Sequence, residues 1–451
     1  MKLKFLKLNI HEEQKSTLET DAIKNYLHFL EIPLKIVGCW DWYQKPTTEY
    51  QIIVNNVYYS LVLFVLINIP ATLYVHLRTE WEEQNLMSSF GKMADSLPYL
   101  VSLIIVIYFG VFRDDLYELV NFMKNNFKYR SANGLTNMTM LNSYKSAKHF
   151  GYFYTACTMF SVTMYVVPEL INWWTDKPLQ SYVYMDVTQS PFFEFAFLRY
   201  FLSQAFVGLA MGQIGVFYAA NSILLCGQLD LLCCSLRNVR YTALLRHGVH
   251  YKSLVTSYSD IQNDELHYYI YNVAELEPSN YHYDEKMYLI VHCCNLILKT
   301  SFDIYSNIYE EATCDALRDC ARVSNIVKTH KDLFESFMSP LLALRVIQVT
   351  LYLCMLLYSA TLKFDIVTVE YLAAVALDTF VYCYYGNQII VQADRVTTAA
   401  YQSAWRSMSA RARRLLLGAL QAHGRPAAVR AGRFLTMDLH TFLVVILLIR
   451  S

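Results

Sequence analysis

The chain has 451 residues with 38 basic and 38 acidic side chains, and it is 55% hydrophobic but only 17% charged. This composition is too apolar for an ordinary soluble protein, and the zero net charge gives no electrostatic signal for nucleic acid. The 14 glycines and 10 prolines are too few for a disordered or fibrous chain, so the sequence indicates a membrane protein.

Long stretches without charged residues predict the membrane helices. A helix needs about 17 to 25 mostly apolar residues to cross a bilayer. Six segments qualify, and in chain order they are 51–77, 96–112, 149–168, 195–229, 336–362 and 371–393. A seventh candidate, 434–449, contains Asp438 and leaves only 11 uncharged residues before Arg450, which at about 1.5 Å per residue cover about half a bilayer.

The distribution of Lys and Arg predicts the orientation. The amino-terminal segment and the even-numbered connections contain 31 of them, whereas the opposite side contains 5. Because basic residues concentrate on the cytoplasmic side, we predict an all-α, polytopic protein of seven transmembrane helices with inverted topology. Its amino terminus is cytoplasmic and its carboxyl terminus extracellular, opposite to a G-protein-coupled receptor.

The segments between the helices complete a predicted division of the chain. It consists of a cytoplasmic amino-terminal segment (1–50), transmembrane helices 1 to 4 (51–229), a cytoplasmic extension (230–335), transmembrane helices 5 and 6 (336–393), a cytoplasmic re-entrant or anchor helix (394–433) and a last, short helix (434–451). Within the extension, apolar spacing at 234–245 and 312–337 predicts that the fourth and fifth transmembrane helices continue into the cytoplasm. The basic stretch 409–433 predicts an amphipathic helix, either packed against neighbouring helices or drawn to anionic lipid.

Sequence motifs of enzymes and of metal sites are missing. The chain has no HExxH, phosphate-loop, dinucleotide-binding, nucleophile-elbow or EF-hand pattern, and its 12 histidines are dispersed. We therefore predict that the protein is not an enzyme and uses no cofactor or metal.

Two charged residues lie inside predicted membrane helices. Arg345 and Asp378 both fall near mid-membrane on consecutive helices. Such charges are costly in lipid, so we expect them to face each other or a wet cavity, the alternative being that each snorkels or meets a backbone group.

The carboxyl-terminal third contains a specific set of motifs. These are Cys383-x-x-Gly386-Asn387, then Ala399-Ala400-Tyr401 followed by Trp405, then Leu439-x-x-Phe442. The set resembles the insect odorant receptor family. Three features depart from the family pattern. Ala393 and Asp394 follow Gly386-Asn387 where family members often have serine, the connection 230–335 is longer than usual, and the final helix stops earlier.

The resemblance implies a function. Family members form ligand-gated, non-selective cation channels, in which a tuning-type, odorant-binding subunit assembles with the shared odorant co-receptor as a heterotetramer. We therefore expect a small, volatile, hydrophobic ligand, a co-receptor subunit and the lipid bilayer as partners, and no nucleic acid. The expected location is the plasma membrane of olfactory sensory neuron dendrites.

The resemblance also implies residue roles, for which ordinary packing and interfacial aromatic belts remain the alternative. The family holds its odorant in the outer half of the second, third, fourth and sixth membrane helices, which here contain Tyr99, Phe160, Met164, Phe195, Phe201, Tyr371 and Phe380. The expected pore-lining residues of the last helix are Leu443, Val444 and Leu447, and the expected structural motif residues are Gly386, Asn387, Tyr401 and Trp405.

Two other functions compete with this one. Insect gustatory receptors share the inverted topology, but they end in a different signature, which this chain lacks. A secondary transporter would show paired inverted repeats, and the sequence shows none.

Overall fold

The fold is known from a computed structural model. It describes residues 28–82, 86–128, 140–175, 192–249, 306–362, 366–403, 405–421 and 427–450. Most of the predicted amino-terminal segment and the middle of the predicted cytoplasmic extension lie outside these ranges. The described residues are overwhelmingly helical, which confirms the all-α prediction.

The first four described helices form one side of the molecule. They are α2 (His28–Ile36), α3 (Glu49–Glu82), α4 (Leu86–Val111) and α5 (Arg113–Asn126). α4 and α5 meet at an angle of 69°, where α5 turns its acidic and basic residues out of the apolar bundle. Two ion pairs fix this corner: Arg113 with Asp41 at 2.5 Å and Lys124 with Glu31 of α2 at 3.0 Å.

The central helices pack closely because of glycine. They are α6 (Leu141–Trp174), α7 (Phe192–Arg237) and the short α8 (Val239–Arg246). A Cβ atom added to Gly208 of α7 would lie 2.4 Å from Cγ2 of Val162, and one added to Gly212 would lie 2.8 Å from Oγ1 of Thr158, both on α6. These two glycines therefore permit the close approach of α6 and α7.

The longest helices extend well beyond the predicted membrane segments. After the turn η1 (Asn307–Tyr309) come α13 (Glu310–Leu362), with 53 residues, and α14 (Ile366–Tyr401). The 46 residues of α7 rise about 70 Å at about 1.5 Å each, roughly twice the thickness of a bilayer core. Both predicted extensions are therefore helical, the first with a break at Asn238 between α7 and α8, and their cytoplasmic location stays a prediction.

The carboxyl-terminal region differs from the prediction of one helix over 394–433. The elements are η2 (Trp405–Ser407), α15 (Ala410–Gln421), β1 (Arg430–Ala431), β2 (Leu435–Thr436) and α16 (Leu439–Arg450). α14 continues through 394 to Tyr401, and the two strands pair antiparallel. Their turn contains Gly432 and Arg433 at φ 60° and 68°, a left-handed conformation that cannot continue a helix.

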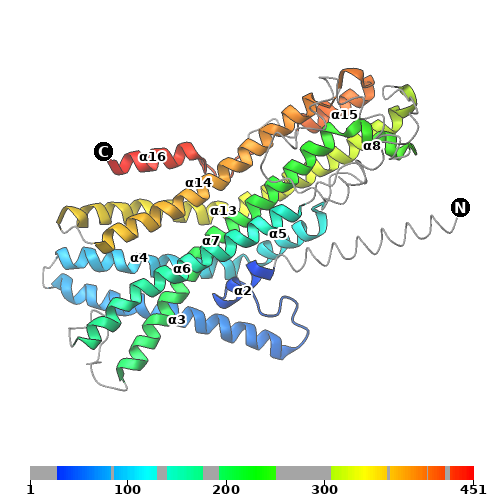
Figure 1. Ribbon diagram of the computed structural model, residues 1–451. Coiled ribbons are helices and arrows are strands. Elements are labelled where there is room, and N and C mark those ends of the chain that lie inside the picture. The colour runs from blue at the N-terminus through cyan, green and yellow to red at the C-terminus, as the bar shows by residue number, and fades with distance from the viewer. Residues whose placement is uncertain are drawn as a thin grey trace.

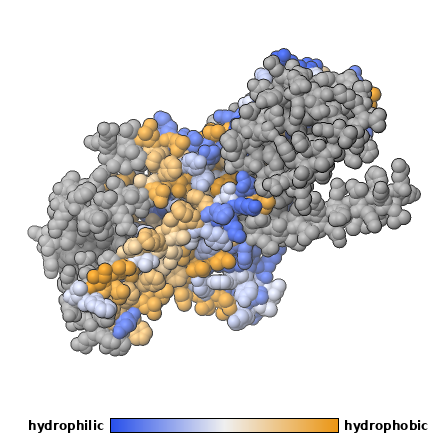
Figure 2. Space-filling model, in the orientation of Figure 1, coloured by the Kyte–Doolittle hydropathy of each residue, from blue (hydrophilic) through white to orange (hydrophobic). Residues whose placement is uncertain are grey.

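The helix ends separate into two groups. In Figure 1 the carboxyl ends of α3, α6, α13 and α16 lie toward one end of the elongated bundle, while α5, α8 and α15 lie toward the other. Hydrophobic side chains gather on the visible surface between these groups, and hydrophilic ones lie on the side of α2 and α5 (Figure 2). This arrangement is the one that alternating membrane crossings require.

The lengths and hydropathy of the described helices support part of the predicted set of membrane helices. Within the described ranges, three helical segments are long and apolar enough to cross a membrane: Glu49–Ile67, Phe193–Arg237 and Asn307–Cys354. The bent pair α4 and α5 gives a fourth. Seven crossings and the inverted orientation stay predictions.

Candidate functional site

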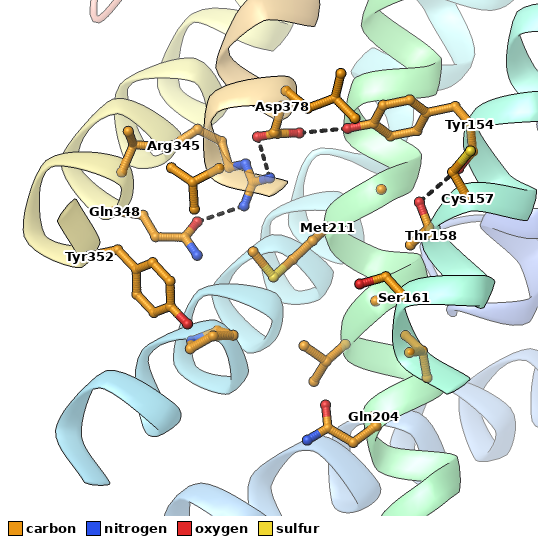
Figure 3. Close-up of a pocket in the computed structure, with 18 of the residues that line it drawn as sticks. Tyr154, Cys157, Thr158, Ser161, Gln204, Met211, Arg345, Gln348, Tyr352 and Asp378 are labelled. Carbon is orange, nitrogen blue, oxygen red and sulfur yellow. Dashed lines mark hydrogen bonds and ion pairs between the residues drawn. The ribbon is translucent and has the colours of Figure 1, made fainter. Parts of the chain in front are cut away.

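A cavity of about 270 Å³ lies between five helices, and Figure 3 shows its walls. α4, α6, α7, α13 and α14 all contribute side chains to it. Its walls are mainly apolar, with Val162, Val207, Met211 and Val349 among them. The volume is just below the usual range for small-molecule sites, so the cavity would hold only one compact ligand.

A buried ion pair forms the polar end of the cavity. The Nη2 atom of Arg345 on α13 lies 2.6 Å from Oδ2 of Asp378 on α14, and the two side chains are only 7% and 11% exposed. The hydroxyl of Tyr154 on α6 donates to the other carboxylate oxygen of Asp378 at 3.0 Å. The expected pairing of the two intramembrane charges is confirmed, and it joins three helices.

Two glutamines add amide groups to the cavity wall. Gln348 lies one turn after Arg345 on α13, and its Oε1 atom accepts a hydrogen bond of 2.6 Å from Nη1 of Arg345. Gln204 on α7 donates to the hydroxyl of Tyr200 at 3.4 Å. The cavity thus combines a charge-neutral polar end with an apolar body, which is the chemistry of a binding site for a small, mostly apolar molecule.

Groups for covalent or metal chemistry are not assembled here. Cys157 is the cysteine of the cavity wall, and no histidine lines it. Across the ranges that the structure describes, no group of His, Cys, Asp and Glu side chains is arranged to hold a metal ion.

Of the seven residues predicted for the ligand, Tyr99 lines the cavity and is 5% exposed. Phe160, Met164 and Phe195 are exposed side chains outside the cavity wall, and Phe201 also lies outside it. Phe380 packs edge-on against Phe442 of α16, with ring centroids 5.4 Å apart. The side chain of Tyr371 is outside the described part of the chain. Ligand contact by these residues stays a prediction.

The residues that sequence reasoning missed are mostly not aromatic. On α6 the cavity is lined by Tyr154, Cys157, Thr158, Ser161 and Val162, which form one helix face at spacings of three and four. Phe160 lies off this face, whereas Met164 is three residues beyond Ser161 and lies past the end of the cavity wall. Aromatic and sulfur-containing side chains were predicted by residue type. Contact with the cavity depends instead on where a residue lies around and along the helix.

The residues predicted for the pore and the motifs lie around α14 and α16. Leu443 and Val444 are exposed, and the side chain of Leu447 is outside the described part. Tyr401 and Trp405 form an edge-on ring pair with centroids 6.1 Å apart. Asn387, about four turns before Tyr401 on α14, is partly exposed.

Gly386 explains one motif physically. A Cβ atom at this position of α14 would lie 2.1 Å from the backbone oxygen of Met437 and 2.8 Å from the hydroxyl of Tyr218. The segment that leads into α16 therefore docks directly on the backbone of α14, and only glycine leaves room for it.

The fold and the cavity are those of a helical membrane receptor, a bundle of long apolar helices with a mainly apolar cavity between them. The sequence profile described as 7tm Odorant receptor matches residues 90–448 of the chain. The protein therefore belongs to the insect odorant receptor family, whose members are odorant-gated cation channels and not enzymes. This membership favours the odorant receptor over the gustatory and transporter alternatives.

Relatives and solved structures agree with this assignment. Odorant receptor 83a of Drosophila melanogaster is 22% identical over 69% of this chain and 67% of its own length. Putative odorant receptor 85e of the same fly is 22% identical over 90% of this chain and 85% of its own. The structure of the olfactory receptor OR5 from the insect Machilis hrabei matches with a TM-score of 0.62 at 14% identity, covering 96% of this chain and 97% of that one. Its complex with eugenol matches with a TM-score of 0.60 at 14% identity, covering 96% and 98%.

Proposed function

We propose that this protein is a tuning-type odorant receptor, the odorant-binding subunit of a heteromeric, non-selective cation channel that it forms with the odorant co-receptor. It acts in the plasma membrane of olfactory sensory neuron dendrites, with seven membrane helices in inverted orientation. The cavity between α4, α6, α7, α13 and α14 supports the proposal most directly, because it is a small, mainly apolar site in the helices where the family holds its ligand.

The structure suggests a route from ligand to pore. Asp378 lines the cavity on α14, and two residues later on the same helix Phe380 contacts Phe442 of α16. A displacement of α14 on ligand binding would therefore move the helix that we propose lines the pore. Opening requires that the odorant bind the open conformation more tightly than the closed one, since equal affinity shifts no population.

A related receptor shows that the fold accommodates a small aromatic molecule. The solved Machilis hrabei complex contains eugenol. For this chain we propose the same general class, a small volatile that is bound by burial of apolar surface, at about 25 cal/mol per Å².

Cys157 offers a direct test of the cavity. It is a free thiol on the cavity wall, and Cys354 on α13 is an exposed free thiol that does not line the cavity. The receptor is expressed with the co-receptor, an activating odorant is found by screening volatiles, and a small methanethiosulfonate reagent is then applied. We expect the odorant-evoked current to fall, and an excess of odorant to slow that fall.

The two cysteine variants supply the controls. Cys157→Ser should abolish sensitivity to the reagent, whereas Cys354→Ser should leave it unchanged. Equal block of the Cys157→Ser receptor would show that the reagent acts at another thiol, and an excess of odorant that fails to slow the modification of Cys157 would place the odorant site elsewhere. Odorant-evoked current from this chain expressed without the co-receptor would contradict the tuning-subunit role.

A further inference from the structure

The following inference rests on the proposed odorant role of the cavity and specifies the chemistry of its ligand. We propose that the cavity selects neutral volatiles with a carbonyl group, such as ketones, aldehydes or esters, and that the side-chain amide of Gln348 donates a hydrogen bond to their oxygen.

The orientation of the Gln348 amide is set by its neighbour. A guanidinium group has only donors, so the group that Gln348 presents to Nη1 of Arg345 must be its oxygen. The Nε2 donors are consequently turned away from Arg345, as Figure 3 shows. Gln348 as a whole is buried, with an exposed fraction of 6%.

Within the described part of the chain, no group accepts a hydrogen bond from this amide nitrogen. The side-chain hydrogen bond that Gln348 makes there is the one that its oxygen accepts from Arg345. The nitrogen is accessible from the cavity, so a ligand without an acceptor would displace the water that can hydrogen-bond to it and put nothing in its place, which costs free energy. A hydrocarbon of the same size would leave the donor unsatisfied. The structure thus favours an acceptor on the ligand at this end of the cavity.

The charges of the cavity argue for a neutral ligand. Asp378 compensates Arg345 at 2.6 Å, and each oxygen of Asp378 already accepts one hydrogen bond, from Arg345 and from Tyr154. A ligand carboxylate beside Gln348 would bring a second negative charge next to the buried carboxylate of Asp378. It would have to compete with Asp378 for Arg345 and would leave one anion uncompensated, which is strongly unfavourable in a low dielectric.

The remaining wall accommodates the apolar part of the ligand. Tyr99 of α4, Val162 of α6 and Val207 and Met211 of α7 contribute apolar surface to the cavity. A molecule with its oxygen at one end and a short hydrocarbon chain or ring at the other therefore matches both ends of the site.

The test compares three probes with the same number of non-hydrogen atoms: methyl hexyl ketone, n-nonane and heptanoate. Membranes containing the receptor with its co-receptor are labelled with N-ethylmaleimide in the Cys354→Ser background, and protection of Cys157 is measured by mass spectrometry of its peptide. We expect the ketone to protect at a concentration about three- to tenfold lower than nonane, the effect of one neutral hydrogen bond. Heptanoate should protect least.

Gln348→Leu should raise the concentration of ketone needed for protection by about three- to tenfold and leave that of nonane unchanged. Protection by nonane also reports that this variant is folded. If protection by nonane is lost, Gln348→Met replaces the leucine variant, because methionine has the unbranched shape of glutamine and no N–H donor. Gln213→Leu is the matched control, since Gln213 is a buried amide of α7 that donates to Thr155 at 3.0 Å and does not line the cavity.

Each other outcome overturns the inference. Equal protection by ketone and nonane, or strongest protection by heptanoate, would exclude a carbonyl-selective cavity while the odorant role stands. Loss of ketone affinity in Gln213→Leu as large as in Gln348→Leu would show that the amide acts through packing. Protection by no probe, including odorants that evoke current, would exclude the cavity as the odorant site and overturn both proposals.

Discussion

At the scale of single residues, the buried ion pair ties the cavity to the stability of the bundle. Arg345, Asp378 and Tyr154 come from three different helices and are buried together. A buried pair of this kind contributes little net stability by itself, because desolvation of both charges offsets their attraction. Removal of one partner alone, however, leaves the other charge buried without compensation, which is strongly destabilising.

We predict that Asp378→Leu destabilises the receptor by about 3 to 5 kcal/mol, because it leaves the Arg345 guanidinium buried without a counter-charge. The double variant Arg345→Met with Asp378→Leu should lose less than either single variant. Thermal unfolding of the purified receptor in detergent measures both effects. A double variant no more stable than the worse single variant would contradict this account.

An exposed pair on the same helix provides the control for that experiment. Arg318 and Asp315 form an ion pair near the start of α13, and their side chains are 47% and 48% exposed. Because exposed pairs contribute about 0 to 1 kcal/mol, Asp315→Leu should change the unfolding temperature far less than Asp378→Leu does.

Gly386 gives the second prediction at this scale. Replacing glycine by alanine inside a helix ordinarily stabilises it by about 1 kcal/mol, but at Gly386 the new Cβ would lie 2.1 Å from a backbone oxygen that cannot rotate away. Gly386→Ala should therefore destabilise the receptor and reduce odorant-evoked current by displacing α16. Gly418 of α15 has open space around a Cβ atom, so Gly418→Ala should be neutral or stabilising. Similar behaviour of the two variants would show that the close approach at Gly386 is unimportant.

At the scale of elements, α16 depends on its first turn because it has only 12 residues. Oδ1 of Asp438 accepts from the backbone N–H of Thr441 at 2.8 Å, which is an N-cap, and its Oδ2 accepts from the hydroxyl of Thr436 at 2.9 Å. The cap therefore joins β2 to the last helix.

We predict that Asp438→Ala frays this first turn. The loss of an N-cap costs about 1 kcal/mol, so hydrogen exchange at the Thr441 amide should accelerate by about fivefold. Asp438→Asn should retain the cap and exchange nearly as slowly as the parent, because asparagine is an equally good N-cap. Fast exchange in the asparagine variant would show that charge, and not the cap, holds the turn.

The elements also show how far the sequence could predict the structure. The gaps between charges located α3, α6, α7 and α14, since exclusion of charge from lipid leaves a strong pattern over about 20 residues. The pair Arg345 and Asp378 was predictable for the same reason, because isolated intramembrane charges need a partner. The hairpin 430–436 was not, since two strands of two residues have no periodicity to detect. Nor was the cavity-facing side of α6, because an apolar helix faces lipid and neighbouring helices with similar residues.

At the scale of the whole molecule, one face of the bundle has the surface expected for contact with lipid. On α3, Ile53, Val57, Leu61 and Phe64 are 58%, 60%, 51% and 69% exposed and repeat at spacings of three and four. Exposed apolar stripes of this size are unfavourable in water, but they are favourable in a bilayer. The orientation of the molecule in that bilayer follows from charge.

The inverted orientation is the prediction on which the whole-molecule interpretation depends. The 31 basic residues assigned to the cytoplasmic side against 5 on the other predict that a tag at the amino terminus is hidden on intact cells, whereas a tag in the loop after Thr175 is exposed. Antibody labelling before and after permeabilisation measures the accessibility of each tag. A tag placed between α15 and β1 should behave like the amino-terminal one, because both lie on the side with the excess of basic residues. Surface labelling of the amino terminus would reverse every assignment of inner and outer ends. It would also place the carboxyl end of α16 in the cytoplasm, where it could not form the outer part of a pore.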